Sequence, residues 1–391
     1  MTDSFRVFFQ VVLLWLAGLG AATQFAKIAV PFAEISQLYP AHSDTIGWLL
    51  SIVSLIGVIL GALSGAIAGR IGPSTLLISG LLLGGAMSLF QATELGFYVM
   101  LLTRVVEGLS HLAIVVAAPT LIAQITHGRA RNAAMVLWST FFGVAFALNA
   151  WAGLPMVARF GLTGYFLIHG LLMLLIAGII YACRIRVDLE QSGSVGFGIS
   201  EWVNAHVKAY RSPFISAPAI GWFFYTLTFV SLLAILPGRL PEHLSATIAG
   251  LMPLAGIVLS WLAVPLLLSV MSCVAVVSLG FALGIAILCA AFMGLPLAAV
   301  CVALFAVLGL VQGGSFAAVP ELNETPEAQA LGYGAMAQMG NAGNLLGTPI
   351  LLAVLWRGGD AGVLAAVIGI YAAAITAHLW LARRRQACLQ S

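Results

Sequence analysis

The chain has 391 residues, of which 62% are hydrophobic and only 7% are Asp, Glu, Lys or Arg, and its formal net charge is +3. About a quarter of the residues in an ordinary soluble domain are charged. This composition therefore excludes a soluble enzyme, a disordered chain and a nucleic-acid binder with a basic face, and it predicts an integral membrane protein.

Long stretches with few or no charges predict membrane-spanning helices, because a helix needs about 20 apolar residues to cross the hydrocarbon layer. Turn signals at Ser269–Ser272 and Gly294–Pro296 divide the uncharged run 243–320 into three passes. The sequence thus predicts an all-α membrane protein with twelve helices in two six-helix halves. The stretches lie at 7–26, 45–69, 71–93, 95–128, 132–158, 160–183, 212–238, 243–320, 328–356 and 361–382.

A polar segment separates the two halves. We expect an N-terminal bundle at 1–183, a linker at 184–212 and a C-terminal bundle at 213–391. In the linker, Trp202, Val203, Val207 and Tyr210 share one helical face, which predicts a helix lying flat at the membrane surface.

The distribution of basic residues predicts the orientation in the membrane. With the N-terminus inside, eleven of the 16 Lys and Arg residues fall on the cytoplasmic side and three on the other. Both termini should therefore be cytoplasmic, in the cell (inner) membrane.

The sequence contains no motif that is typical of a metal, nucleotide or catalytic site. The five cysteines lack metal-ligand spacing, and their odd number argues against a complete set of disulfides. No Gly-x-x-x-x-Gly-Lys-Ser/Thr stretch occurs, so the chain should not hydrolyse ATP through a P-loop, and no catalytic set is visible. We expect neither a cofactor nor an enzyme.

Two six-helix halves joined by a cytoplasmic linker resemble the major facilitator superfamily. Between the second and third helices, the signature of that superfamily is matched by Gly65, Arg70 and Gly72, although Gly69 replaces its Asp. The glycines at 57, 61, 65 and 69 recur every four residues, which predicts close helix packing without any transport role.

The fourth helix gives the stronger match, since Arg104, Glu107 and Gly108 follow the spacing found in many superfamily members. The Gly-Pro pattern of drug antiporters is degraded at 143–148, where no Pro occurs. The resemblance implies a monomeric secondary transporter that works by alternating access, with a cavity lined by helices 1, 4, 7 and 10. Its partners would be a small-molecule substrate, protons and the lipid bilayer.

Arg104, Glu107 and His111 lie on one face of the fourth helix and are the candidates for proton coupling. Charges inside a membrane are costly, so they need partners or a water-filled cavity. The alternative is structural: Arg104 would bind backbone carbonyls of a neighbouring helix, and Glu107 would neutralise it.

The first helix offers Thr23, Gln24 and Lys27 for substrate binding. Lys27 is positioned to receive an anionic or zwitterionic group, or else it reaches the outer interface. The C-terminal half offers amides, a hydroxyl and aromatic rings, which either bind substrate or join helices. These residues are Trp222, Tyr225, Thr226, Gln312, Gln338 and Asn341.

Lys27, Arg104 and Glu107 place all the expected intramembrane charge in the N-terminal half. With Glu107 protonated, the site holds two cations and favours an anion, which would couple substrate to protons. The leading hypothesis is a proton-coupled transporter of a small anionic or zwitterionic metabolite. The alternatives are export of drugs or of a siderophore-like metabolite by proton antiport, and a sensor that transports nothing.

Overall fold

The computed structural model describes residues 3–61, 71–185 and 199–390, which form helices and turns without any strand. Contacts divide the chain into two compact units. Unit 1 contains residues 1–56 and 63–196, and unit 2 contains residues 57–62 and 197–391. Each unit is described by itself, and the predicted boundaries at 183 and 213 stay a prediction.

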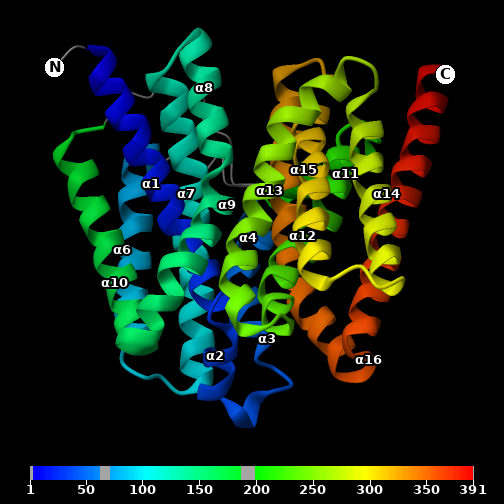
Figure 1. Cartoon of the computed structure of the whole chain (residues 1–391). Coiled ribbons are helices and arrows are strands. Elements are labelled where there is room, and N and C mark those ends of the chain that lie inside the picture. The colour runs from blue at the N-terminus through cyan, green and yellow to red at the C-terminus, as the bar shows by residue number, and fades with distance from the viewer. Residues whose placement is uncertain (1–2, 62–70, 186–198, 391) are drawn as a thin grey trace. The chain divides into compact units, whose positions relative to one another are not determined.

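In unit 1, α1 (Asp3–Ala29) packs against α6 (Pro73–Gln91), α7 (Phe97–Ile125) and α10 (Leu154–Ala182) (Figure 1). Buried aliphatic side chains of these four helices form its core. The shorter elements are α2 (Phe32–Leu38), η1 (Pro40–His42), α3 (Gly47–Ser51), η2 (Ile52–Ser54), α8 (Gly128–Ser139), α9 (Phe141–Leu148) and the π-helical η4 (Asn149–Gly153).

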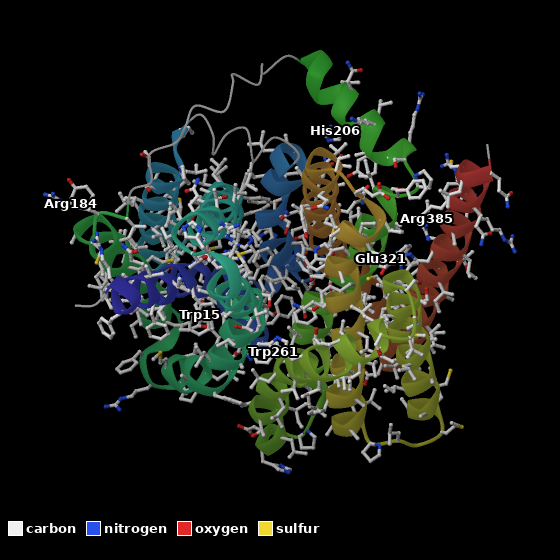
Figure 2. The ribbon with its side chains drawn as sticks, turned by 90° about the horizontal axis from the view of Figure 1, so that it is seen from above. Trp15, Arg184, His206, Trp261, Glu321 and Arg385 are labelled. Atoms are coloured by element: carbon white, nitrogen blue, oxygen red, sulfur yellow. The ribbon has the colours of Figure 1, made fainter. Side chains whose placement is uncertain are left out.

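A polar contact ties α1 to the junction of α8 and α9. Trp15, labelled in Figure 2, donates from its indole Nε1 to the hydroxyl of Thr140 at 3.2 Å. Because Trp15 is on the same helix as Lys27, this bond helps to fix the helix that carries the candidate substrate-binding residues.

In unit 2, α12 (Ser216–Ile235) packs against α16 (Pro326–Gln390), while α15 (Leu297–Leu322) packs against α13 (Glu242–Leu268) and α14 (Cys273–Phe292) (Figure 1). Glu321, labelled in Figure 2, accepts the backbone N–H of Cys273 at 3.1 Å and so joins the end of α15 to the start of α14. The remaining elements are α11 (Ile199–Arg211) and η5 (Pro237–Arg239); α4 (Leu55–Leu60) spans the division between the units.

The described residues contain nine apolar stretches that are long enough to cross a membrane. Two of them, Phe141–Ala182 and Ala328–Gln390, have 42 and 63 residues, which exceeds a single pass. Each is interrupted by a glycine with positive φ: Gly161 (φ 68°) and Gly359 (φ 60°). Glycine adopts this conformation without the steric cost of a Cβ, so each long stretch divides there into two passes.

The all-helical membrane architecture expected from the sequence is confirmed. The predicted turns near 269–272 and 294–296 fall between α13 and α14 and between α14 and α15. The expected second helix is represented by the short apolar segment Gly47–Leu60, and its continuation at 62–70 lies outside the described residues. The linker helix is present as α11, whereas its location at a membrane surface stays a prediction.

Candidate functional site: a buried charge network in unit 1

Three charged side chains meet inside unit 1: Lys27 of α1, and Arg104 and Glu107 of α7. None of the three side chains has any exposed surface. Lys27 Nζ lies 2.5 Å from Glu107 Oε1, and Arg104 Nη1 pairs with Glu107 Oε2. Lys27 therefore does not reach an interface, and that alternative is excluded.

Helix α6 contributes two neutral partners to the network. The Gln91 carbonyl oxygen accepts from Lys27 Nζ at 2.6 Å, while its amide nitrogen donates to Glu107 Oε2 and Thr103 Oγ1, both at 2.9 Å. Ser88 Oγ accepts from Lys27 Nζ at 2.9 Å. The three protons of the ammonium group are therefore matched by Glu107, Gln91 and Ser88.

Helix α10 closes the network with His169. The ring nitrogen Nε2 lies 3.1 Å from the carbonyl oxygen of Gly20, and Nδ1 lies 2.9 Å from Ser88 Oγ and 3.5 Å from Lys27 Nζ. A carbonyl can only accept, so we assign the ring proton to Nε2 and an acceptor lone pair to Nδ1. The ammonium of Lys27 also lies 5.5 Å from the ring centroid of Phe166.

Arg104 has one partner outside the ion pair. Its Nε donates to the backbone carbonyl of Leu49 in α3 at 2.8 Å, as the structural alternative for this residue expects. Its Nη2 is buried and has no hydrogen-bond partner among the described residues. A buried guanidinium nitrogen with unused N–H groups is costly unless a ligand or water satisfies it, so Nη2 is an unused donor of the network.

Next to the charges, α1 and α7 are joined by neutral polar groups. Gln24 Nε2 donates to Ser110 Oγ at 2.8 Å, and Gln24 Oε1 is buried without a partner in the described part of the chain. His111 Nδ1 lies 3.1 Å from the carbonyl oxygen of Ala21, so this nitrogen carries the ring proton. Arg104, Glu107 and His111, which share one face of α7, are all buried.

Thr23 belongs to a second polar cluster that the sequence did not reveal. Asn149 Nδ2 donates to Thr23 Oγ1 at 3.1 Å, and Tyr165 OH donates to Asn149 Oδ1. Asn149 begins the π-helical segment η4, and such segments are frequent at functional sites. A polar side chain within an apolar helix was the available signal for Asn149.

The aromatic candidates of unit 2 lie together on α12 and α15. The ring of Trp222 stacks on Tyr225 with centroids 4.7 Å apart and meets Phe316 edge-on at 5.0 Å. Tyr225 OH lies 3.5 Å from Gln312 Oε1, a long contact. Trp222 and Gln312 are partly exposed, so this cluster offers aromatic surface and an amide.

The remaining candidates of unit 2 have partners within the protein. Gln338 Nε2 donates to the carbonyl of Val58 at 2.8 Å, and Gln338 Oε1 accepts from Tyr210 OH at 2.8 Å. Burial raises the pKa of Tyr210 to about 12, so its hydroxyl keeps the proton that it donates. Asn341 and Thr226 bond to carbonyls of their own helices. Roles of these residues in substrate binding stay predictions.

The signature between the second and third helices is only partly described. Gly65 and Arg70 lie outside the described residues, and Gly72 precedes α6 with φ 87°. Of the glycines at four-residue spacing, Gly57 and Gly61 face α16: an added Cβ would lie 2.2 Å from Asn341 Cγ and 3.3 Å from Gln338 Cα, respectively. The predicted close approach is thus confirmed at these two positions.

Formal charges do not cancel in the network of unit 1. It holds two cations and one carboxylate, so one positive charge remains when both neighbouring histidines are neutral. Burying charge is expensive even when it is paired. The site can therefore lower its energy by binding an anion or by losing a proton.

Comparison with known proteins agrees with this architecture. One relative is the niacin transporter NiaP of Acinetobacter baylyi (strain ATCC 33305 / BD413 / ADP1), 30% identical over 170 residues. That match covers 42% of this chain, and the chain spans only 38% of the length of that relative. A sequence profile of the Major Facilitator Superfamily matches residues 13–348. The chain therefore belongs to the major facilitator superfamily, a family of membrane transporters rather than enzymes.

Proposed function

We propose that this superfamily transporter carries a small organic anion or zwitterion in a proton-coupled cycle of alternating access. The observation that carries the proposal is the fully buried network of Lys27, Arg104 and Glu107, which retains one positive charge. A carboxylate entering its field is stabilised, and the change in local charge alters proton binding there. The sequence led us to expect proton coupling at Arg104, Glu107 and His111, and these residues lie within this network or next to it.

The partial similarity to a niacin transporter supports a carboxylate as the substrate. Niacin is a small aromatic acid whose carboxyl group is ionised at neutral pH. The positive charge that the network of unit 1 retains suits the carboxylate of such a molecule. The protein would act as a monomer in the cell (inner) membrane with both termini cytoplasmic, as the distribution of Lys and Arg favours.

Nicotinate and nicotinamide form a matched pair of probes, because they share a ring and differ in charge. Purified protein in liposomes should take up nicotinate, or another member of a panel of small carboxylates, in preference to the corresponding amide. A pH gradient should change the rate of uptake. Equal uptake of acids and amides, together with indifference to the pH gradient and to Glu107→Gln, would contradict the proposal.

One observation favours a second candidate, export of hydrophobic drugs. Trp222, Tyr225 and Phe316 form an aromatic cluster that could hold flat apolar molecules. Deleting the gene should then raise drug susceptibility, whereas a metabolite carrier leaves it unchanged. A sensor that transports nothing would bind a probe without catalysing its counterflow in liposomes.

A further inference from the structure

Lys27 is the charged group of the network whose loss of a proton would bring the net charge of the network to zero. Glu107 accepts hydrogen bonds from Lys27, Arg104 and Gln91, so its ionised form fits the site. Protonating Glu107 would remove these acceptors and raise the excess to two positive charges. A guanidinium group does not lose its proton in proteins. Loss of a proton from Lys27 is the step that makes the network neutral.

The groups around Lys27 are compatible with the loss of its proton. The ionisable side chains that face it in the described residues are Glu107 and Arg104 of α7 and His169 of α10. Helix α6 presents only the neutral Ser88 and Gln91, and α9 contains no titratable residue. A neutral amine keeps two N–H groups for Glu107 and Gln91, and its lone pair accepts from the Ser88 hydroxyl when that hydroxyl turns away from His169 Nδ1 and the carbonyl of Phe166.

We propose that Lys27 carries the mobile proton of the transport cycle, while Glu107 stays ionised as its fixed counter-charge. Without substrate, the ammonium group of Lys27 releases one proton to water and the network becomes neutral. When an anion binds near unit 1, it adds one negative charge. Lys27 then takes up a proton, and the positive charge of its ammonium group balances the anion. The role of the anion in this inference rests on the proposed function, whereas the titration of Lys27 does not.

The expected coupling is large enough to measure. A carboxylate about 10 Å from Lys27, at an effective dielectric constant of about 20, changes the proton-binding constant by at least about tenfold. By linkage, protonation strengthens anion binding by the same factor. One anion and one proton then bind together, which corresponds to symport.

The composition of the chain allows a direct test. Lys27 and Lys208 are its two lysines, so protein labelled with 15N at the lysine side chains gives two NMR signals in lipid nanodiscs. In the Lys208→Arg variant, the remaining lysine signal comes from Lys27. The substitution leaves the network unchanged, because Lys208 is exposed on α11. Without organic anions, we expect the Lys27 signal to change from that of an ammonium to that of an amine within the pH range over which the protein stays folded in the nanodiscs. Nicotinate should shift that change to higher pH by about one unit, and nicotinamide should not.

The outcomes separate this inference from the proposed function. If Lys27 stays an ammonium over the whole pH range in which the protein is folded, the inference is overturned, whether or not a carboxylate is transported. If nicotinate is transported but leaves the Lys27 titration unchanged, the coupling is overturned. A titrating Lys27 in a protein that transports no carboxylate would contradict the proposed function and support the inference about the proton.

A substitution gives an independent readout in liposomes. Lys27→Arg fixes the positive charge, because arginine keeps its proton. Uptake of a transported carboxylate by this variant should no longer respond to the pH gradient. Unaltered pH dependence in Lys27→Arg would place the mobile proton elsewhere and overturn the proposal.

Discussion

The two units differ in where their ion-paired side chains lie. Unit 1 buries Lys27, Arg104 and Glu107, and the polar atoms of α6 and α10 are arranged around them. In the described part of unit 2, the charged pair Arg239–Asp360 is about half exposed, at 46% and 51%, while the helix contacts use glycines, amides and rings. The difference is that unit 1 buries its ion-paired network, whereas in unit 2 the Arg239–Asp360 pair is half exposed and the buried Arg385 donates to the carbonyl of Pro213.

The largest expected effect comes from removing the single anion of the network. Glu107→Leu leaves two buried cations without their counter-charge and should destabilise the protein by about 3–5 kcal/mol. Denaturation followed in lipid or detergent measures the loss. Asp360→Leu is the matched control in unit 2, since breaking an exposed pair costs about 0–1 kcal/mol. Similar losses in the two variants would break the comparison.

Packing should dominate in unit 2. An added Cβ at Gly347 would lie 2.1 Å from the carbonyl oxygen of Leu227 and 2.5 Å from Ser231 Oγ, so Gly347→Ala forces α12 and α16 apart. We expect a loss of about 1–3 kcal/mol. Gly369→Ala is the control on the same helix, because nothing lies within 4 Å of its added Cβ. A control as unstable as Gly347→Ala would refute the close-packing account.

A smaller effect is expected at the Gln338 amide. Gln338→Ala removes its bonds to Val58 and Tyr210 and should cost about 1 kcal/mol. Asn341→Ala removes a bond within its own helix and should cost less. The same variants tested against a solute panel show whether either residue also selects substrate, with little effect expected on pH dependence.

The smallest effect on stability is expected for Lys27→Met, although its effect on function should be large. The variant leaves the neutral pair of Arg104 and Glu107, so, unlike Glu107→Leu, it leaves no buried charge without a counter-charge. Preference for nicotinate over nicotinamide should disappear, as binding measurements with both probes would show. A variant that keeps the preference would separate Lys27 from anion selection.

The sequence predicted the charged centre of the site and missed its neutral partners. Arg104 and Glu107 are conspicuous because charges in an apolar run are expensive, and their spacing fixes a shared helix face. Ser88, Gln91 and Asn149 are neutral, and their bonds to distant helices depend on tertiary packing. The spacing of residues along α10 likewise gives no sign that His169 faces Lys27.

The order of the helices was largely predictable from the positions of charged and turn-forming residues. Uncharged length and turn residues locate the passes, so the ends of α13, α14 and α15 follow the sequence signals. The π-helical segment at Asn149–Gly153 was not predicted, and neither was the hydrogen bond that Asn149 accepts there from Tyr165. Sequence patterns report burial and period, whereas such contacts depend on the neighbouring helix.

A structure with a transported carboxylate bound tests the central claim most directly. The account predicts that the carboxylate lies closer to Lys27 and Arg104 than to any polar group of α12, α15 or α16. The apolar part of the molecule would then contact aromatic side chains. A carboxylate held by the amides of unit 2, with the network of unit 1 remote from it, would contradict the division of charge between the two units.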